Sequence, residues 1–356
     1  WWAANGVDRV HGGYVEQMTM GGRDAGVEFK RTRVTARQIY VFSHGHVLGF
    51  EKGVDLARHG VDFLISKTWN GTDRGFSKLL TRKGEPLDPT PDLYDHAFVL
   101  FALAWFHKAT GDKDARDWLH RTLDYVETRM RHPTAGFWHE LPRQGPRQQN
   151  PHMHLTEACL AAFDATGEKR FADVATEIIG LFQTRFFDLK TQTLAEYFTD
   201  DLKRVPGDDG RIVEPGHQFE WAWILNSSRK LLGLDLAKEI RAAASFAEKN
   251  GVDPSSCATY NQVRDDGAPV DRGSRAWPNC ERIKAALALY ELDGADPSNV
   301  VHSSTALLLE RYLAHSPHGT WIDAFDAAGA PVANAIPAST LYHVFLAFAE
   351  VLRISD

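Results

Sequence analysis

The sequence predicts an all-α protein of the (α/α)6 class, a toroid (barrel) of paired helices with short β-hairpins at its mouth. Two patterns predict this class. A unit built of a short aromatic strand, a turn rich in glycine and proline, and an apolar helix recurs about every 60 residues, as in repeat architectures. Between successive apolar helices lies a second segment, in which apolar and charged residues alternate at helical spacing.

The recurring unit occurs six times, at residues 12–42, 74–104, 135–162, 193–225, 258–289 and 319–349. Its helix opens on polar residues, which therefore fall at the same place in each unit. The steps stay close to one period when they are counted between comparable points, namely Arg37, Asp95, His154, His217, Glu281 and His343. We expect these six helices to form the inner wall of the toroid.

The second segment is represented by residues 112–131, 168–187 and 234–250, whose apolar residues lie on one side and whose charges lie opposite. Such segments are expected to be outer helices with one solvated face. If each inner helix is followed by an outer one, closure into a ring buries every inner face. An open solenoid of the same hairpins is the alternative. Six units are few for an array, and neither end of the chain resembles a polar cap.

Length and charge favour one globular domain, residues 1–356, that acts on a small molecule. A chain of 356 residues exceeds the usual size of one core, but an annular core escapes that limit. The net charge of -7 and the isoelectric point near 6.2 do not indicate a basic surface for binding nucleic acid or an anionic membrane as partner. The longest apolar run, AFVLFALAWF, is too short to span a bilayer.

The cysteines favour a reducing compartment. There are three, an odd number without metal-ligand spacing, and Cys159 is expected to be a small core residue. No secretory signal peptide is present, and the chain begins at Trp1 without a methionine, so an N-terminal piece is expected to be missing. We therefore expect a cytoplasmic protein, either a monomer or a homo-oligomer.

Polar residues at the start of the apolar helices are the candidate site. His154 and Glu157 are three residues apart and share a helix face, and His217 and Glu220 repeat this spacing. The other candidates are Arg37, Asp95, Glu281 and His343, with Trp221 and Trp277 at the rim as surfaces for a sugar ring. All are expected to converge on the mouth of the ring.

These residue types suit proton transfer on a neutral polyhydroxylated substrate. Histidine titrates near neutrality and can move a proton from carbon and return it. A glutamate at i+3 can orient the imidazole, and Arg37 can stabilise negative charge on an enediolate oxygen. The roles describe a sugar isomerase or epimerase acting through a cis-enediol.

Simpler interpretations apply to some of these residues. His96 alone is expected to be a core histidine, and His152 must point away from His154. Asp95 and Glu281 also fit carboxylates favoured by the dipole at a helix start. Two His-x-x-Glu pairs resemble part of a di-metal site, but the other helices lack the further carboxylates that such a site needs.

Six strings in order resemble the motifs of the N-acylglucosamine 2-epimerase superfamily: RTRVTARQIYVFS, DLYDHAFVLFALA, NPHMHLTEACLAA, EPGHQFEWAWIL, RAWPNCERIKA and IPASTLYHVFLAF. The resemblance covers nearly the whole chain. It implies an (α/α)6 barrel that needs no metal or redox cofactor. It also implies that His217 and His343 are the paired acid and base, and that the residues at substrate-binding or supporting positions are Arg37, His154, Glu220 and Glu281. Trp221 after Glu220 looks like the mannose-isomerase branch.

The expected function is therefore an aldose–ketose isomerase that interconverts mannose and fructose, with a monosaccharide as its partner. A 2-epimerase is the alternative of the same class. An (α/α)6 glycoside hydrolase, which needs two carboxylates about a bond, and a non-catalytic sugar-binding module are the others. An anionic sugar stays open because of Arg31, Arg33, Arg272 and Arg275.

Overall fold

The computed structural model describes residues 1–355, and the chain divides into two compact units. Unit 1 contains residues 1–19, 23–178 and 337–342, and unit 2 contains the other described residues. The two units are described separately below. The prediction that 1–356 forms a single domain stays a prediction.

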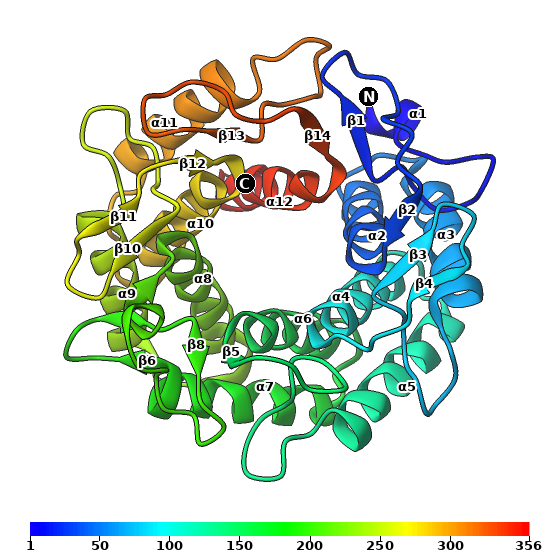
Figure 1. Cartoon of the computed structure of the whole chain (residues 1–356), viewed down its shortest axis with the longest axis horizontal. Coiled ribbons are helices and arrows are strands. Elements are labelled where there is room, and N and C mark those ends of the chain that lie inside the picture. The colour runs from blue at the N-terminus through cyan, green and yellow to red at the C-terminus, as the bar shows by residue number, and fades with distance from the viewer. Residues whose placement is uncertain (356) are drawn as a thin grey trace. The chain divides into compact units, whose positions relative to one another are not determined.

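The described residues form twelve α-helices, shown in Figure 1. The helices predicted as inner are α2 (Thr32–Val47), α4 (Leu93–Thr110), α6 (Asn150–Thr166), α8 (Pro215–Leu232), α10 (Ala276–Asp293) and α12 (Leu341–Ser355). The others are α1 (Trp2–Asn5), α3 (Gly53–Phe63), α5 (Lys113–Arg129), α7 (Lys169–Leu181), α9 (Ala237–Asn250) and α11 (Ser298–Leu307). Within residues 1–355, a further α-helix follows each of α2, α4, α6, α8 and α10 before the next of the predicted inner helices.

The strands are two or three residues long and lie between the helices. Their bounds are β1 (Gln17–Thr19), β2 (Phe29–Arg31), β3 (Leu79–Thr81), β4 (Pro86–Asp88), β5 (Arg147–Gln148), β6 (Phe187–Asp188), β7 (Thr193–Leu194), β8 (Tyr197–Phe198), β9 (Ile212–Val213), β10 (Gln262–Arg264), β11 (Pro269–Asp271), β12 (Ser274–Arg275), β13 (Ala324–Phe325) and β14 (Ala335–Pro337). In unit 1, β2, β3 and β4 form an antiparallel sheet, and in unit 2 β9, β10 and β11 form another.

Within each unit the inner helices pack on one another and on outer helices. In unit 1, α4 contacts α2, α6 and α5, and α3 contacts α2 (Figure 1). In unit 2, α10 contacts α8 and α11, and α8 contacts α9. The core of unit 2 joins Cys280, Ile283 and Leu287 of α10 to Val344 and Ala347 of α12. A helix with neighbours on several sides must be apolar around its circumference, as α4 is.

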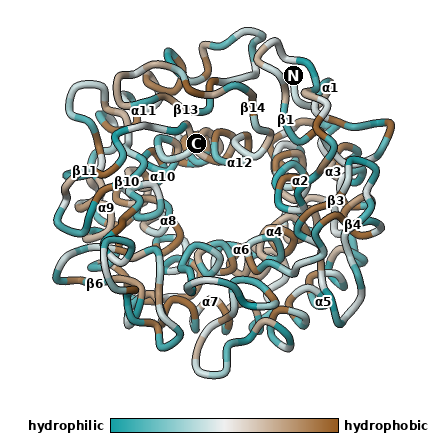
Figure 2. The backbone as a smooth tube through the Cα atoms, viewed as in Figure 1, coloured by the Kyte–Doolittle hydropathy of each residue, from teal (hydrophilic) through white to brown (hydrophobic). Residues whose placement is uncertain are grey.

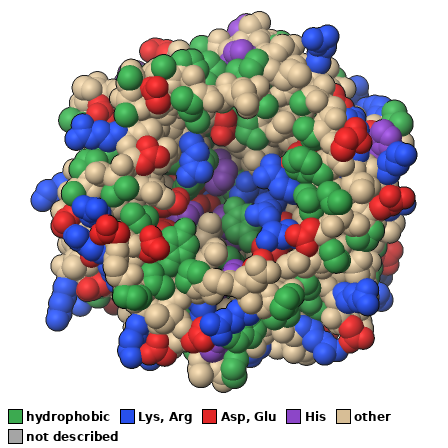
Figure 3. Space-filling view, viewed as in Figure 1, with side chains coloured by type: hydrophobic (Ala, Val, Ile, Leu, Met, Phe, Trp, Pro, Cys, Tyr) green, Lys and Arg blue, Asp and Glu red, His purple; other side chains and the backbone are tan. Residues whose placement is uncertain are grey.

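The outer helices are amphipathic, as predicted. Figure 2 shows hydrophilic and hydrophobic residues alternating along α5 and α9. Figure 3 shows basic and acidic side chains intermixed around the margin of the face in view, rather than gathered by sign. Within residues 1–355, no helix has the length and the apolar character that crossing a membrane requires.

Local sequence signals set the ends of the inner helices. The Asp92 side chain caps α4 by accepting hydrogen bonds from the backbone N–H groups of Tyr94 and Asp95. Prolines stand in the first turn of α6 and α8, where a missing N–H costs nothing. Gly111 and Gly233 end α4 and α8 in the left-handed conformation that glycine adopts most readily.

A repeated hydrogen bond joins a hairpin segment to the helix that follows it. A buried polar side chain in the first turn of the helix accepts a backbone N–H of the hairpin, at 2.8 to 3.1 Å. The pairs are Phe76 N–H to His96 Nε2, Phe137 N–H to His152 Nε2, Leu194 N–H to Gln218 Oε1 and Thr259 N–H to Asn279 Oδ1. We call these acceptors, His96, His152, Gln218 and Asn279, the clamp residues. Each satisfies a buried N–H that would otherwise lack a partner.

The clamp residues show how the repeats correspond. Two positions after them stand Phe98, His154, Glu220 and Glu281. His154 therefore corresponds to Glu220, and not to His217 as the sequence period suggested. The expectation that the two histidines occupy matching positions is wrong, because the period of about 60 residues is not constant enough to fix the register of a helix.

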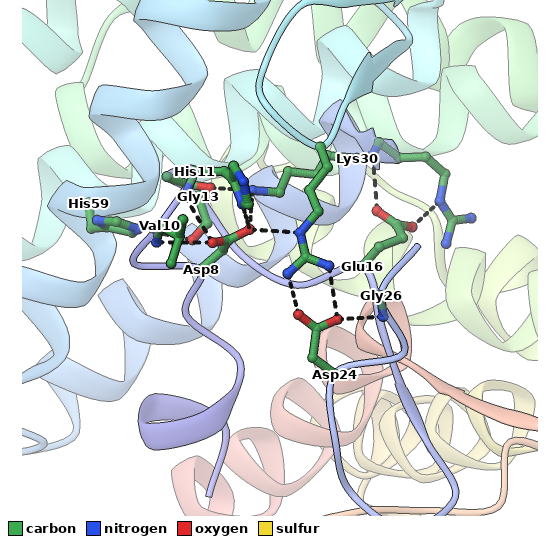
Figure 4. Close-up of polar contacts among 12 residues, drawn as sticks. Asp8, Val10, His11, Gly13, Glu16, Asp24, Gly26, Lys30 and His59 are labelled. Atoms are coloured by element: carbon green, nitrogen blue, oxygen red, sulfur yellow. Dashed lines mark hydrogen bonds and ion pairs between the residues drawn. The ribbon is translucent and has the colours of Figure 1, made fainter. Parts of the chain in front are cut away.

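A buried ion pair fixes the N-terminal loop in unit 1. The Lys30 Nζ on β2 donates to Asp8 Oδ2 at 2.9 Å and to the carbonyl oxygen of Gly12, and the His11 N–H donates to Asp8 Oδ1 (Figure 4). Both charged side chains are almost fully buried. Burial raises the pKa of Asp8, but the hydrogen bonds from His11 and Lys30 outweigh it and hold that pKa at about 2.

We expect Lys30→Met to destabilise the protein by about 3 to 5 kcal/mol, because it leaves the Asp8 carboxylate buried without its main cation. Lys169→Met is the matched control, since Lys169 forms an exposed ion pair with Asp173 and its loss should cost less than about 1 kcal/mol. Urea unfolding of both variants measures the difference. Equal midpoints would contradict the assignment of Lys30 as an anchor.

Candidate active site

Two histidines of unit 2 both lie close to one tryptophan. His217 is in the first turn of α8 and His343 is near the start of α12. The Trp277 ring centroid is 5.2 Å from that of His217 and 5.4 Å from that of His343. Trp277 is half-buried while both histidines are almost fully buried. Both imidazole rings are therefore within reach of one indole ring.

His217 is surrounded by carboxylates. Its Nδ1 lies 3.0 Å from Glu196 Oε2 and 3.6 Å from Glu214 Oε2. The segment between β7 and β8 brings Glu196 to this ring, and an orienting role of Glu220 stays a prediction. Burial lowers the pKa of His217, but the charges of Glu196 and Glu214 outweigh it and raise the pKa to about 9. His217 therefore carries a proton at neutral pH.

His343 is held by one carboxylate. Its Nδ1 lies 2.8 Å from Glu281 Oε1, and Glu281 is fully buried on α10. The contact fixes the ring orientation and leaves Nε2 as the nitrogen for chemistry. Glu281 was predicted as a substrate-binding or supporting residue, and the geometry is that of a support.

Glu220 of α8 completes this cluster. Ligand atoms of Glu220, Glu281 and His343 all lie within 4.8 Å of one another, and all three residues are buried. Among residues 1–355, Glu220 Oε1 has no hydrogen-bond partner. The donor set suits a metal, but Lys284 Nζ lies 2.6 Å from Glu281 Oε2 and places a cation there already. A divalent ion would be repelled by this ammonium group.

In unit 1, His154 forms the predicted pair with Glu157. Its Nδ1 lies 3.1 Å from Glu157 Oε2, and the other oxygen, Oε1, accepts a hydrogen bond from the Tyr342 hydroxyl at 2.5 Å. The His154 ring packs against Phe98 and edge-on against Tyr94. The carboxylate therefore orients both an imidazole and a phenol.

Arg37 is a buried cation in an aromatic setting. Its guanidinium carbon lies 4.3 Å from the Phe98 ring centroid and 5.0 Å from that of Tyr342. Nη2 donates to the Tyr94 hydroxyl at 2.6 Å, and Arg37 Nε has no partner within residues 1–355. The charge of Arg37, held among aromatic rings, is suited to an oxygen of a ligand.

Asp95 binds a neighbouring arginine. Its Oδ1 accepts the backbone N–H of Arg33 at 2.9 Å and lies 3.1 Å from Arg33 Nε. Burial raises the pKa of Asp95 to about 7, and the positive charge of Arg33 opposes that rise. The role of Asp95 in substrate binding stays a prediction.

Three expectations about buried side chains can be compared with the structure. His96 and His152 are fully buried clamp residues, and burial lowers their pKa values to about 4 and about 3. Both are therefore structural histidines, as was expected of His96. Cys159 lies in the core, also as expected. Trp221 does not lie at a rim, since it is fully buried against Phe182. It cannot offer a ring face to a sugar.

Sequence reasoning missed Glu196, Glu214 and Lys284. Glu196 lies on no helix, 21 residues before the histidine that it contacts, so no helical period marks it. Glu214 and Lys284 stand three residues from His217 and Glu281, and that spacing was the available signal.

Comparisons with known proteins agree with this geometry. Residues 12–347 match the family described as N-acylglucosamine 2-epimerase (GlcNAc 2-epimerase). A relative from Rhizobium meliloti (strain 1021), named mannose-6-phosphate isomerase, is 34% identical over 98% of this chain and 92% of its own.

Two solved structures share the fold. A D-mannose isomerase matches with a TM-score of 0.91 at 23% identity, over 98% of this chain and 94% of its own. A cellobiose 2-epimerase from Spirochaeta thermophila DSM 6192 matches with a TM-score of 0.88 at 24% identity, over 99% and 92%. These matches confirm the predicted (α/α)6 fold class. The chain belongs to the N-acylglucosamine 2-epimerase family of sugar isomerases and 2-epimerases.

Proposed function

We propose that the protein interconverts D-mannose and D-fructose through a cis-enediol. The observation that carries this proposal is the pair of buried histidines that both lie close to Trp277, each with its own carboxylate partner. An indole ring of this kind can support the apolar face of a hexose between an acid and a base.

The proposed chemistry moves one proton between carbons and one between oxygens. Neutral His343 takes the proton from C2 of open-chain mannose while protonated His217 gives one to O1, which forms the enediol. His343 then returns its proton to C1, and His217 recovers a proton from O2 as the C2 carbonyl forms. The raised pKa of His217 supports its role as the acid. The binding roles of Arg37, His154, Glu157 and Glu220 stay predictions.

Charge pairing favours a neutral hexose over a phosphorylated one. Arg31 forms an ion pair with Glu16, Arg33 pairs with Asp95, and Arg275 lies 3.7 Å from Glu214. These arginines are therefore already compensated. Mannose 6-phosphate is the second candidate, because the Rhizobium meliloti relative carries that name.

Product analysis tests the proposal. We expect D-mannose to give D-fructose as the first product, and reaction in deuterated water to place deuterium at C1 of fructose, diluted by direct transfer. Mannose 6-phosphate should be turned over more slowly. Glucose as the first product, deuterated at C2, would instead identify a 2-epimerase, and turnover of mannose 6-phosphate alone would identify a phosphosugar enzyme.

We expect His217→Asn and His343→Asn each to lower kcat by about 10² to 10⁴-fold, the usual contribution of a positioned acid or base. Asparagine retains a donor for Glu196 or Glu281, so the fold should persist by circular dichroism. His302→Asn, at an exposed position of α11, is the control. Near-wild-type kcat in either variant would remove that histidine from the mechanism.

The acid role of His217 predicts a pH dependence. With a folded pKa of about 9 against an ordinary 6.5, the interactions of His217 stabilise the fold fully below pH 6.5 and are lost as the pH rises through 9.

Because His217 must be protonated to act as the acid, we expect kcat/KM to fall on the alkaline side near pH 9. Glu196→Gln should move that limb down by about one unit or more, since it removes the nearest carboxylate. Glu310→Gln, at an exposed site, is the control and should leave the alkaline limb of kcat/KM in place. An unmoved alkaline limb in Glu196→Gln would refute the assignment of His217 as the acid.

A further inference from the structure

Lys284 is a fully buried lysine one helical turn from Glu281. Both side chains have no solvent exposure, and Nζ lies 2.6 Å from Glu281 Oε2. The spacing of three residues puts the two groups on one face of α10. Lysine is almost never fully buried unless it is paired, because desolvation of its charge is costly. Lys284 lies beside Glu281, the carboxylate that holds His343, and we therefore expect its burial to have a functional reason.

Three inner helices hold the ammonium group in place. Nζ of Lys284 lies 4.1 Å from the centroid of the Trp223 ring of α8. The Trp223 indole N–H donates to Glu350 Oε2 of α12 at 2.8 Å, and Arg353 donates to the same carboxylate. The lysine head is thus fixed from one side by an aromatic face and from the other by Glu281.

Glu281 connects this lysine to His343. One carboxylate oxygen faces Lys284 and the other lies 2.8 Å from His343 Nδ1. Within unit 2, the charged groups close to His343 include Glu220 from α8, and Glu281 with Lys284 from α10. Without the lysine, the carboxylate that contacts the imidazole would lose a cation in direct contact.

The setting of His217 is different. It faces Glu196 and Glu214, and Glu220 adds a further negative charge. The half-exposed Arg275 lies 3.7 Å from Glu214. Solvent screens a half-exposed charge far more than a fully buried one. Each histidine therefore has a carboxylate partner, and the Glu281 carboxylate is in direct contact with a buried cation.

We propose that Lys284 is a positioning residue that fixes Glu281 and offsets its charge, so that His343 stays a neutral base while His217 keeps its proton. The inference rests on the proposed function for the role of His343. The difference between an acid and a base would then come from one buried lysine rather than from the histidines themselves.

The test is Lys284→Met, which retains most of the side-chain volume and removes the charge. Titration of His343 by NMR on protein with labelled histidines, with the signal assigned by its loss in His343→Asn, needs no substrate. We expect the His343 pKa to rise by about one unit or more. The acid limb of kcat/KM should move up equally, so that kcat/KM falls about tenfold or more below the limb and recovers above it. KM should change little.

Controls separate charge from structure. Lys230→Met removes an exposed lysine that pairs with Glu291 and should move neither the pKa nor the limb. In the double variant Glu281→Gln, Lys284→Met, both charges are absent, and the His343 pKa should not rise above that of the wild type. This double variant also tests the inference if Lys284→Met does not fold. Replacing both members of a buried ion pair destabilises a protein less than removing one member alone.

The possible outcomes are distinct. An unchanged His343 titration in folded Lys284→Met, or a fall in kcat/KM by the same factor at every pH, would overturn the inference and leave Lys284 a structural residue. So would a double variant whose His343 pKa rises. If the wild type turns over no hexose, the proposed function fails, while the NMR titration still decides the linkage between Lys284 and His343.

Discussion

The clamp hydrogen bonds are the constraint on which the rest of the structure depends. A helix that is buried on several sides leaves no water for the backbone of the hairpin beside it. His96, His152, Gln218 and Asn279 each supply the acceptor that the hairpin N–H requires. Because the clamp fixes the first turn of each helix against its hairpin, the residues around it are held rigidly. A rigid helix start is where catalytic side chains can be positioned best.

Burial then forces the polar side chains of these first turns into pairs. His154 pairs with Glu157, His217 with Glu196, and His343 with Glu281. Each pair satisfies buried polar groups at a cost that an apolar core would avoid. Function is the reason to accept that cost, and the same contacts that satisfy the buried groups also orient each imidazole ring.

In the proposed mechanism, the charges of unit 2 give two similar histidines different tasks. Glu196 and Glu214 keep a proton on His217. The ammonium group of Lys284 lies against Glu281 on the side away from His343. An acid and a base near one indole ring are what aldose–ketose conversion needs, and one fold can provide both only if the surroundings of the two histidines differ.

The sequence by itself determined the helical repeat, the inner and outer helix types and the candidate site residues His217, His343 and Glu281. Periodicity and local spacing can be recognised from the order of residues alone. Only the tertiary structure decided the partners. Glu196 contacts His217 from an irregular segment. Trp221 stands three residues before the buried Ile224 and is itself a core residue. Side-chain pairing depends on distances between segments far apart in sequence, and no local pattern carries that information.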